Sequence, residues 1–186
     1  MSFSSPTADF VLLATTDASS SASVSFDGYF SSTYKNYKVF FSDVYPATTN
    51  TSLYIRFRRS NADVTASNYQ YAGRRTHQIG GGSDVNDGRF AYTGTSFEVL
   101  TNSSPNSATR TNSAEITIYS PLSTTSYKKI RIQANGASDD GGGSNGIWNT
   151  DIFGNLYDNA NALSGITFYF SSGNISAGNF KLYGIK

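Results

Sequence analysis

Apolar and polar residues alternate along most of this chain. Near its end, Ile166, Phe168 and Phe170 alternate with Thr167 and Tyr169. Successive side chains of a β-strand point to opposite faces, so this two-residue period predicts a strand with one buried face. Similar runs occur at residues 10–14, 22–26, 37–41, 53–57, 89–100, 115–119, 129–133 and 180–183, with less regular ones at 68–72 and 147–153. The sequence therefore predicts about ten strands.

No long window shows the 3.6-residue period and the end signals of a helix. Alternation on nearly every strand favours antiparallel sheets over a parallel sheet, whose strands are apolar on both faces. We therefore expect an all-β protein, an antiparallel, jelly-roll-like β-sandwich. Because no break in composition suggests a second domain, we expect one domain over residues 8–186. Residues 1–7 are expected to form a flexible or partner-contacting N-terminal arm.

The closing segment, residues 166–186, predicts a hairpin in which a turn of Ser, Gly and Asn joins two alternating strands. Three other stretches rich in small polar residues predict long loops, at residues 80–88, 101–112 and 135–146. Loops on a rigid sheet scaffold often carry binding residues. We therefore expect any binding specificity to lie there.

The charges are few and balanced, with 14 Lys and Arg against 13 Asp and Glu and a net charge of +1. This balance gives no electrostatic reason to expect nucleic acid or an anionic membrane as a partner. The lack of cysteine excludes disulfides and cysteine-ligated metals. The N-terminal residues do not have the charged and apolar regions of a signal peptide, and no apolar run is long enough for a membrane span.

Residues suited to catalysis are scarce. His77 is the only histidine, and no nucleophile-elbow motif accompanies it, so we interpret it as an ordinary loop residue. Glycoside hydrolysis needs two carboxylates across a cleft. The only glutamates are Glu98 and Glu115, and no spacing selects a pair. Glu115 precedes the apolar Ile116, which predicts a solvated position on a strand. We expect no enzymatic activity and no cofactor.

One Gly-rich loop combines oxygen-bearing side chains with flexible backbone. Asp139, Asp140 and Asn145 flank a run of three glycines, and calcium takes carboxylate, amide and carbonyl oxygens from such loops. The loop matches neither the EF-hand nor the Gly-Gly-x-Gly-x-Asp repeat. These residues are the metal candidates of the chain, and the alternative is an ordinary turn.

Arginines form the only basic concentration of the sequence. They are Arg56, Arg58, Arg59, Arg74 and Arg75. By alternation, Arg56 and Arg58 lie on the strand face opposite Ile55 and Phe57. The planar guanidinium group suits pairing with carboxylates across a subunit interface. A solvated sheet face is the alternative.

Tyrosine and tryptophan rings are candidates for stacking against sugars. Trp148 is the first to test, because it follows the predicted Asp/Gly loop. Aromatic residues make up 15% of the chain, so most of them must belong to the core.

Several segments resemble those of small virion proteins of tailed bacteriophages. These are the Ala/Ser-rich run at residues 22–26, the Tyr-x-x-Tyr strand that begins at Tyr34, residues 53–57 with 67–72, and the closing stretches 166–174 and 178–185. Together they span most of the chain, as patterns of strands and turns rather than as a chemical signature. Residues 80–88 and 135–148 match nothing in that family.

The resemblance implies a β-sandwich or jelly roll that serves as a head decoration (cement) protein or as a tail- or fibre-associated part, with no catalytic residues. We therefore expect a non-enzymatic virion structural protein that is assembled in the host bacterial cytoplasm and has phage capsid or tail proteins as partners. Self-association is expected, and a trimer is favoured. The alternative is a tail- or fibre-associated module that binds a host-surface glycan, and a polysaccharide-cleaving domain ranks third.

Overall fold

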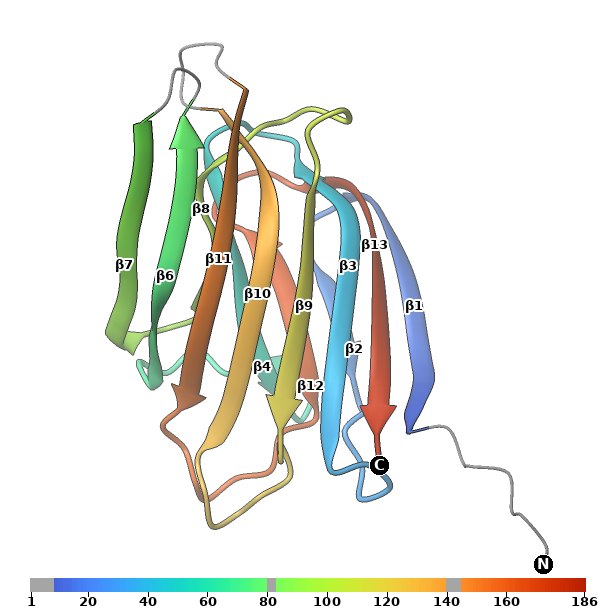
Figure 1. Cartoon of the computed structure of the whole chain (residues 1–186). Coiled ribbons are helices and arrows are strands. Elements are labelled where there is room, and N and C mark those ends of the chain that lie inside the picture. Colours follow the sequence, from blue (N-terminus) through green and yellow to red (C-terminus); the bar gives the residue numbers. More distant parts are fainter. Residues whose placement is uncertain (1–8, 80–82, 140–144) are drawn as a thin grey trace, which may run out of the picture.

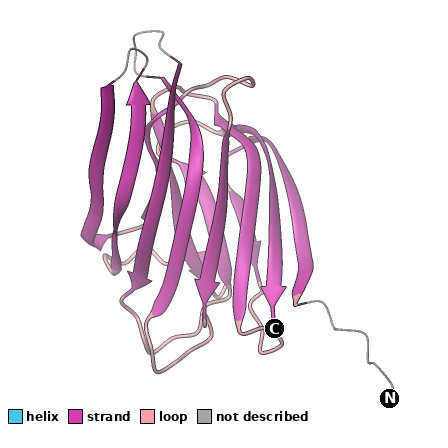
Figure 2. Cartoon of the chain, viewed as in Figure 1, coloured by secondary structure: helices cyan, strands magenta, loops and turns pink. Residues whose placement is uncertain are grey.

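The computed structural model describes residues 9–79, 83–139 and 145–186. These residues form two antiparallel sheets and no helix, and hence no helix that could span a membrane (Figure 2). The strands are β1 Phe10–Ser21, β2 Val24–Asp27, β3 Asn36–Pro46, β4 Thr51–Arg59, β5 Ala62–Asp63, β6 Tyr69–Ile79, β7 Ser83–Gly94, β8 Phe97–Ser104, β9 Asn112–Tyr119, β10 Lys128–Asp139, β11 Asn145–Leu156, β12 Gly165–Phe170 and β13 Ile175–Ile185.

The sheets differ in size. Eight strands form one sheet in the order β1-β13-β3-β9-β10-β11-β6-β7, which faces the viewer in Figure 1. The second sheet has the order β2-β12-β4-β5, and β8 pairs with β4 beside β5. All pairings are antiparallel, so the predicted all-β antiparallel sandwich is confirmed. Its jelly-roll character stays a prediction.

The described residues contain 13 strands rather than about ten. Two of the predicted long loops are largely strand. β6 ends at Ile79 and β7 begins at Ser83, whereas β10 ends at Asp139 and β11 begins at Asn145. Sheet ladders are held by backbone hydrogen bonds, so Ser, Asn and Gly residues continue a strand where a paired neighbour is present. The predicted arm, residues 1–7, lies outside the described residues.

The predicted closing hairpin is wrong. β12 pairs with β2 and β4 in the smaller sheet, whereas β13 pairs with β1 and β3 in the larger one. The turn between them therefore crosses from one sheet to the other. The apolar face of each strand is turned to the same core from opposite sides, so the alternation in the sequence is the same as that of a hairpin.

Aromatic rings from both sheets fill the space between them. Two three-ring clusters are Phe41, Phe168 and Phe180, with centroids 5.2–6.1 Å apart, and Phe57, Tyr69 and Phe97, with centroids 4.8–6.4 Å apart. Within the second cluster, the hydroxyl of Tyr69 accepts a hydrogen bond from the Phe57 amide at 3.0 Å and donates one to the Val64 carbonyl at 2.8 Å. The hydroxyl group of this buried tyrosine therefore has both a donor and an acceptor partner within the protein.

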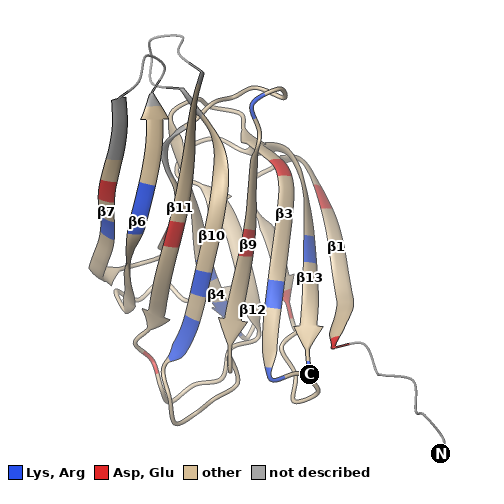
Figure 3. Ribbon diagram, in the orientation of Figure 1, with Lys and Arg blue, Asp and Glu red and all other residues tan. Residues whose placement is uncertain are grey.

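The two outer faces have different environments. On the smaller sheet, Arg58 and Thr167 lie in a network of hydrogen bonds, and Tyr54 packs beside Tyr169 at 5.8 Å. On the larger sheet, every second residue of β3, β9, β10, β11 and β6 is turned away from the core, and none of the described segments covers that face (Figure 1). Charged residues of both signs are spread over its strands, with no large area of one sign (Figure 3). This outer face of the eight-stranded sheet positions the candidate site.

Candidate functional site

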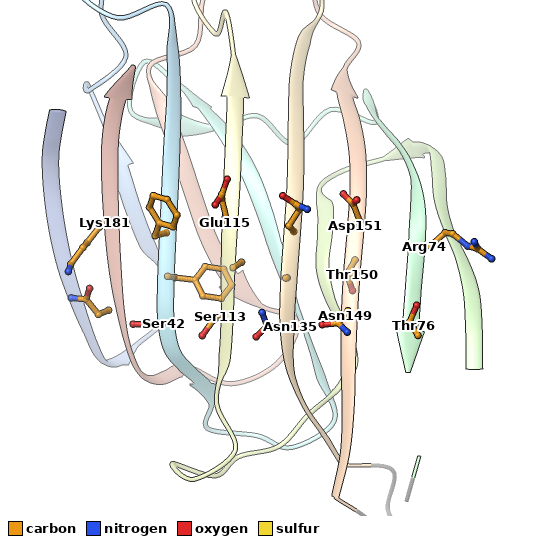
Figure 4. Close-up of a pocket in the computed structure, with 16 residues that line it drawn as sticks. Ser42, Arg74, Thr76, Ser113, Glu115, Asn135, Asn149, Thr150, Asp151 and Lys181 are labelled. Atoms are coloured by element: carbon orange, nitrogen blue, oxygen red, sulfur yellow. The ribbon is translucent and has the colours of Figure 1, made fainter. Parts of the chain in front are cut away.

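A groove of about 710 Å³ lies on the outer face of the eight-stranded sheet. Its lining side chains come from six neighbouring strands, β13, β3, β9, β10, β11 and β6 (Figure 4). The volume falls within the range of small-ligand sites in proteins, roughly 300–1,000 Å³. We call this feature the outer groove.

A row of neutral polar side chains crosses the outer groove. Ser113, Asn135, Asn149 and Thr76 are direct cross-strand neighbours on β9, β10, β11 and β6, and Figure 4 shows them at one level. Neighbouring strands are roughly 4.8 Å apart, so these groups repeat at about that interval. Each asparagine amide presents two donors and an acceptor oxygen. The row therefore offers regularly spaced hydrogen-bonding groups for a ligand that lies across the strands.

The neighbouring cross-strand row, two residues along each strand, contains the carboxylates of Glu115 and Asp151. Each carboxylate pairs with a cation from the following row. Glu115 forms an ion pair with Lys38, and Asp151 accepts hydrogen bonds from Arg131 at 3.3 and 3.4 Å. Gln133 lies between the two acids in the cross-strand register. Because both acids are paired with cations, most of their charge is compensated. The predicted solvated position of Glu115 on a strand is confirmed by its half-exposed side chain.

Phe40 places an aromatic ring in the outer groove. Its side chain points outward from β3 and is 37% exposed, although its neighbours Val39 and Phe41 are buried. The ring meets Tyr183 edge-on at 5.7 Å, and the ammonium group of Lys38 lies 5.5 Å from its centroid. These contacts fix the ring without covering it, which leaves an apolar surface for the C–H face of a ligand.

Trp148, the predicted stacking residue, does not lie in the outer groove. Its side chain is 1% exposed, and its indole nitrogen donates a hydrogen bond to the Ala137 carbonyl at 2.9 Å. The alternation of β11 turns residue 148 inward and Asn149 outward, so the ring belongs to the core. The prediction placed Trp148 after a loop, whereas β11 already begins at Asn145.

The predicted arginines mostly bind carboxylates of their own chain. Arg58 donates to Asp27 at 2.9 Å and to Asp63 at 2.7 Å. Arg59 pairs with Asp158, Arg75 pairs with Asp87, and the guanidinium carbon of Arg56 lies 4.7 Å from the centroid of Tyr169. Of the five, only Arg74 lines the outer groove. The predicted orientation of Arg56 and Arg58 away from Ile55 and Phe57 is confirmed.

Two aspartates near these arginines have altered acidity. Burial acts to raise the pKa of Asp27, but hydrogen bonds from Ser164 and Arg58 together with the guanidinium charge outweigh it, and the pKa lies below its ordinary value. The pKa of Asp158 is lowered in the same way, since burial is outweighed by hydrogen bonds from Arg59 and Asn161 and by the charge of Arg59. Both carboxylates are therefore ionised partners that hold segments together.

The remaining candidates lie away from the outer groove. His77 is a buried residue of β6 and not a loop residue. Glu98 accepts hydrogen bonds from Arg89 and from Ser52, and burial followed by the charge of Glu98 raises the pKa of Tyr71 to about 12. The described residues contain no group of three His, Asp or Glu side chains suited to a metal ion.

The three residues of the predicted calcium site lie at the edge of the described part of the chain. Asp140 lies outside the described residues. The backbones of Asp139 and Asn145 pair at the ends of β10 and β11, and the description of these two residues covers the backbone alone. The three residues therefore stay a prediction.

Sequence reasoning missed the outer groove because its residues are individually ordinary. The sequence predicts a loop at Asn135, and no pattern in it singles out Asn149 or Lys181. An aromatic residue on the polar side of an alternating strand, Phe40, was the one local signal. The alignment of six strands into rows depends on long-range register, which alternation alone does not define.

Comparison with protein-family models, with curated proteins and with solved structures gives no match for this chain. The interpretation of the outer groove therefore rests on its own residues.

Proposed function

We propose that this protein is a non-enzymatic structural protein of a bacteriophage particle, and more specifically a capsid decoration (cement) protein that docks on the assembled shell. The strands that contain the segments resembling phage virion proteins supply much of the core of the sandwich; they are β2, β3, β4, β6, β12 and β13. Self-association, with a trimer favoured, belongs to the same proposal.

An exposed aromatic patch on the outer face is the observation that carries this proposal. Phe153 and Phe90 flank the small Ala72 in one cross-strand row, and they are 59% and 80% exposed. Tyr92, two residues further along β7, is 78% exposed. Aromatic side chains are enriched in protein interfaces, and contiguous exposed apolar groups mark them. The three rings carry no charge themselves, and the nearby guanidinium group of Arg131, 5.0 Å from the Phe153 centroid, is paired with Asp151. Docking through these rings is therefore expected to depend little on salt concentration.

The test is the composition of purified particles. Mass spectrometry of intact virions is expected to find the protein at a fixed copy number relative to the major capsid protein. Particles stripped of it should rebind the wild type, and the double variant F90S/F153S should rebind at least tenfold more weakly. Leu12→Ser, a change of an exposed apolar residue at the other end of the same face, should rebind normally. Absence of the protein from purified particles would overturn the proposal.

The outer groove favours a second function, recognition of a host-surface polysaccharide by a tail- or fibre-associated protein. The row of Asn and hydroxyl side chains matches the alternating donors and acceptors of sugar hydroxyls, and Phe40 supplies a ring for a sugar C–H face. Ligand sites of proteins combine such apolar surface with a few placed polar groups.

A glycan array with matched variants tests this second function. Asn149→Ala is expected to lose binding at least tenfold, because the amide lies at the centre of the row. Asn155→Ala provides the control, since Asn155 is on the same outward face of β11 but does not line the outer groove. Equal binding by the two variants, or no bound glycan for the wild type, would remove the second function.

A further inference from the structure

Two cations at opposite ends of the outer groove indicate which class of polysaccharide it takes. Arg74 projects from β6 and Lys181 from β13, and both line the outer groove and are exposed (Figure 4). Within residues 9–79, 83–139 and 145–186, neither side chain has a hydrogen bond or ion pair. The other cations near the outer groove, Lys38 and Arg131, are already paired with Glu115 and Asp151.

The positions of the charges determine where in the outer groove an acidic group of a ligand binds most favourably. An anion near the centre of the outer groove meets Glu115 and Asp151, whose charges are compensated but still repel at short range. At one end, Lys181 has the uncharged Thr15 and Phe40 as its cross-strand neighbours. At the other end, Asp151 lies beside Arg74 but is already paired with Arg131, so Arg74 keeps its attraction for an anion. The attraction is therefore greatest at the two ends, beside Arg74 and Lys181.

The separation of the two cations sets the length of the ligand. They lie in one cross-strand row, Lys181–Phe40–Glu115–Gln133–Asp151–Arg74, which crosses from β13 to β6. Five strand spacings correspond to roughly 24 Å. This span is too long for a monosaccharide, and the neutral row of Asn and hydroxyl groups runs parallel to it. A ligand that contacts both cations is thus an extended chain laid across the strands.

We infer that the outer groove binds an acidic polysaccharide, with carboxylate groups of the sugar chain at Arg74 and Lys181 and sugar hydroxyls on the Asn135–Asn149 row. This inference rests on the second proposed function. It adds the charge class of the ligand, its direction across the sheet and the residues that select it.

The experiment measures affinity for polygalacturonate, alginate and hyaluronate, each beside its own derivative in which the carboxyl groups are reduced to alcohols. The wild type is expected to bind at least one acidic polymer at least fivefold more tightly than its reduced form. Arg74→Gln and Lys181→Gln should each weaken binding of the acidic polymer about two- to fivefold, as expected for exposed charge pairs. Lys129→Gln, an exposed lysine of β10 that does not line the outer groove, should bind as the wild type does. Thermal unfolding confirms that each variant is folded.

The possible failures are distinguishable. If acidic and reduced polymers bind equally, and Asn149→Ala still abolishes binding, the outer groove recognises glycans but the charge assignment is wrong. If polyglutamate binds as tightly as the acidic polymers with the same dependence on Arg74 and Lys181, the partner is an acidic protein segment and the polysaccharide assignment is overturned. If neither any polymer nor any arrayed glycan binds, both the inference and the glycan function are wrong.

Discussion

Arg58 is the side chain that closes the outer face of the smaller sheet. Its guanidinium group donates to Asp27, Asp63 and the hydroxyl of Thr167, and so connects β4 with β2, β5 and β12. Each of the three groups is part-buried, so removal of the guanidinium leaves carboxylates with little water to replace it. The arginines that sequence analysis offered for a subunit interface thus act largely within the fold.

Replacement of Arg58 by methionine is expected to lower the free energy of unfolding by about 2–4 kcal/mol, because two part-buried carboxylates lose their cation. Arg56→Met is the matched control on the same face of β4. Among the described residues, its guanidinium group contacts the Thr95 carbonyl and the Tyr169 ring, so its loss should cost less than about 1 kcal/mol. Urea denaturation measures both values, and equal losses would contradict the assigned role of Arg58.

Because the pKa values of Asp27 and Asp158 are lowered, the free energy of unfolding is expected to depend on pH in the acidic range. A carboxyl whose pKa is lower in the folded state stabilises the protein above the ordinary aspartate pKa of about 4, and this contribution is lost as pH falls through the lowered value. Urea midpoints between pH 7 and pH 3 should therefore fall below about pH 4. The fall should be smaller for Arg58→Met, which has already lost the Arg58 hydrogen bond and charge that help to lower the pKa of Asp27. A midpoint that is constant down to pH 3 would refute this interpretation.

At the scale of elements, alternation predicted the position and the buried face of most strands but not their ends or partners. Phe168 and Phe180 were correctly assigned to buried faces, yet their strands belong to different sheets. β10 and β11 continue through Asn, Ser and Gly residues because each pairs with the other, a property of the sheet that no single strand shows. The outer groove depends on the same long-range pairing, and so its members were not identified.

Gly154 of β11 lies where the larger sheet approaches β8 of the smaller sheet closely enough to exclude a side chain. A Cβ atom there would lie 2.6 Å from Cε1 of Phe97, so the two sheets approach too closely for any larger residue. Gly154→Ala is expected to lower stability by about 1–3 kcal/mol through overpacking. Gly88→Ala on β7, where a Cβ would meet no atom within 4 Å, should change stability by less than about 0.5 kcal/mol. Thermal unfolding of the two variants measures the difference, and equal midpoints would show that the β11–β8 contact is looser than described.

At the scale of the molecule, the sandwich has two unlike outer faces. The smaller sheet presents arginines and tyrosines that are engaged with each other and with carboxylates. The larger sheet presents a groove of neutral and charged polar groups with an exposed aromatic patch beside it. The proposed docking on a phage particle uses the aromatic patch, and the proposed glycan recognition uses the outer groove. Both assign function to the same face.

The most direct test of this account is to map the ligand contacts on the protein by NMR. Backbone amide shifts of the ¹⁵N-labelled protein would be followed during titration with a polygalacturonate oligosaccharide and with its carboxyl-reduced form. The account predicts that the acidic form shifts amides of β6, β9, β10 and β11 around Thr76, Ser113, Asn135 and Asn149, while the smaller sheet is unaffected. Shifts confined to the smaller sheet, or none with either form, would contradict it.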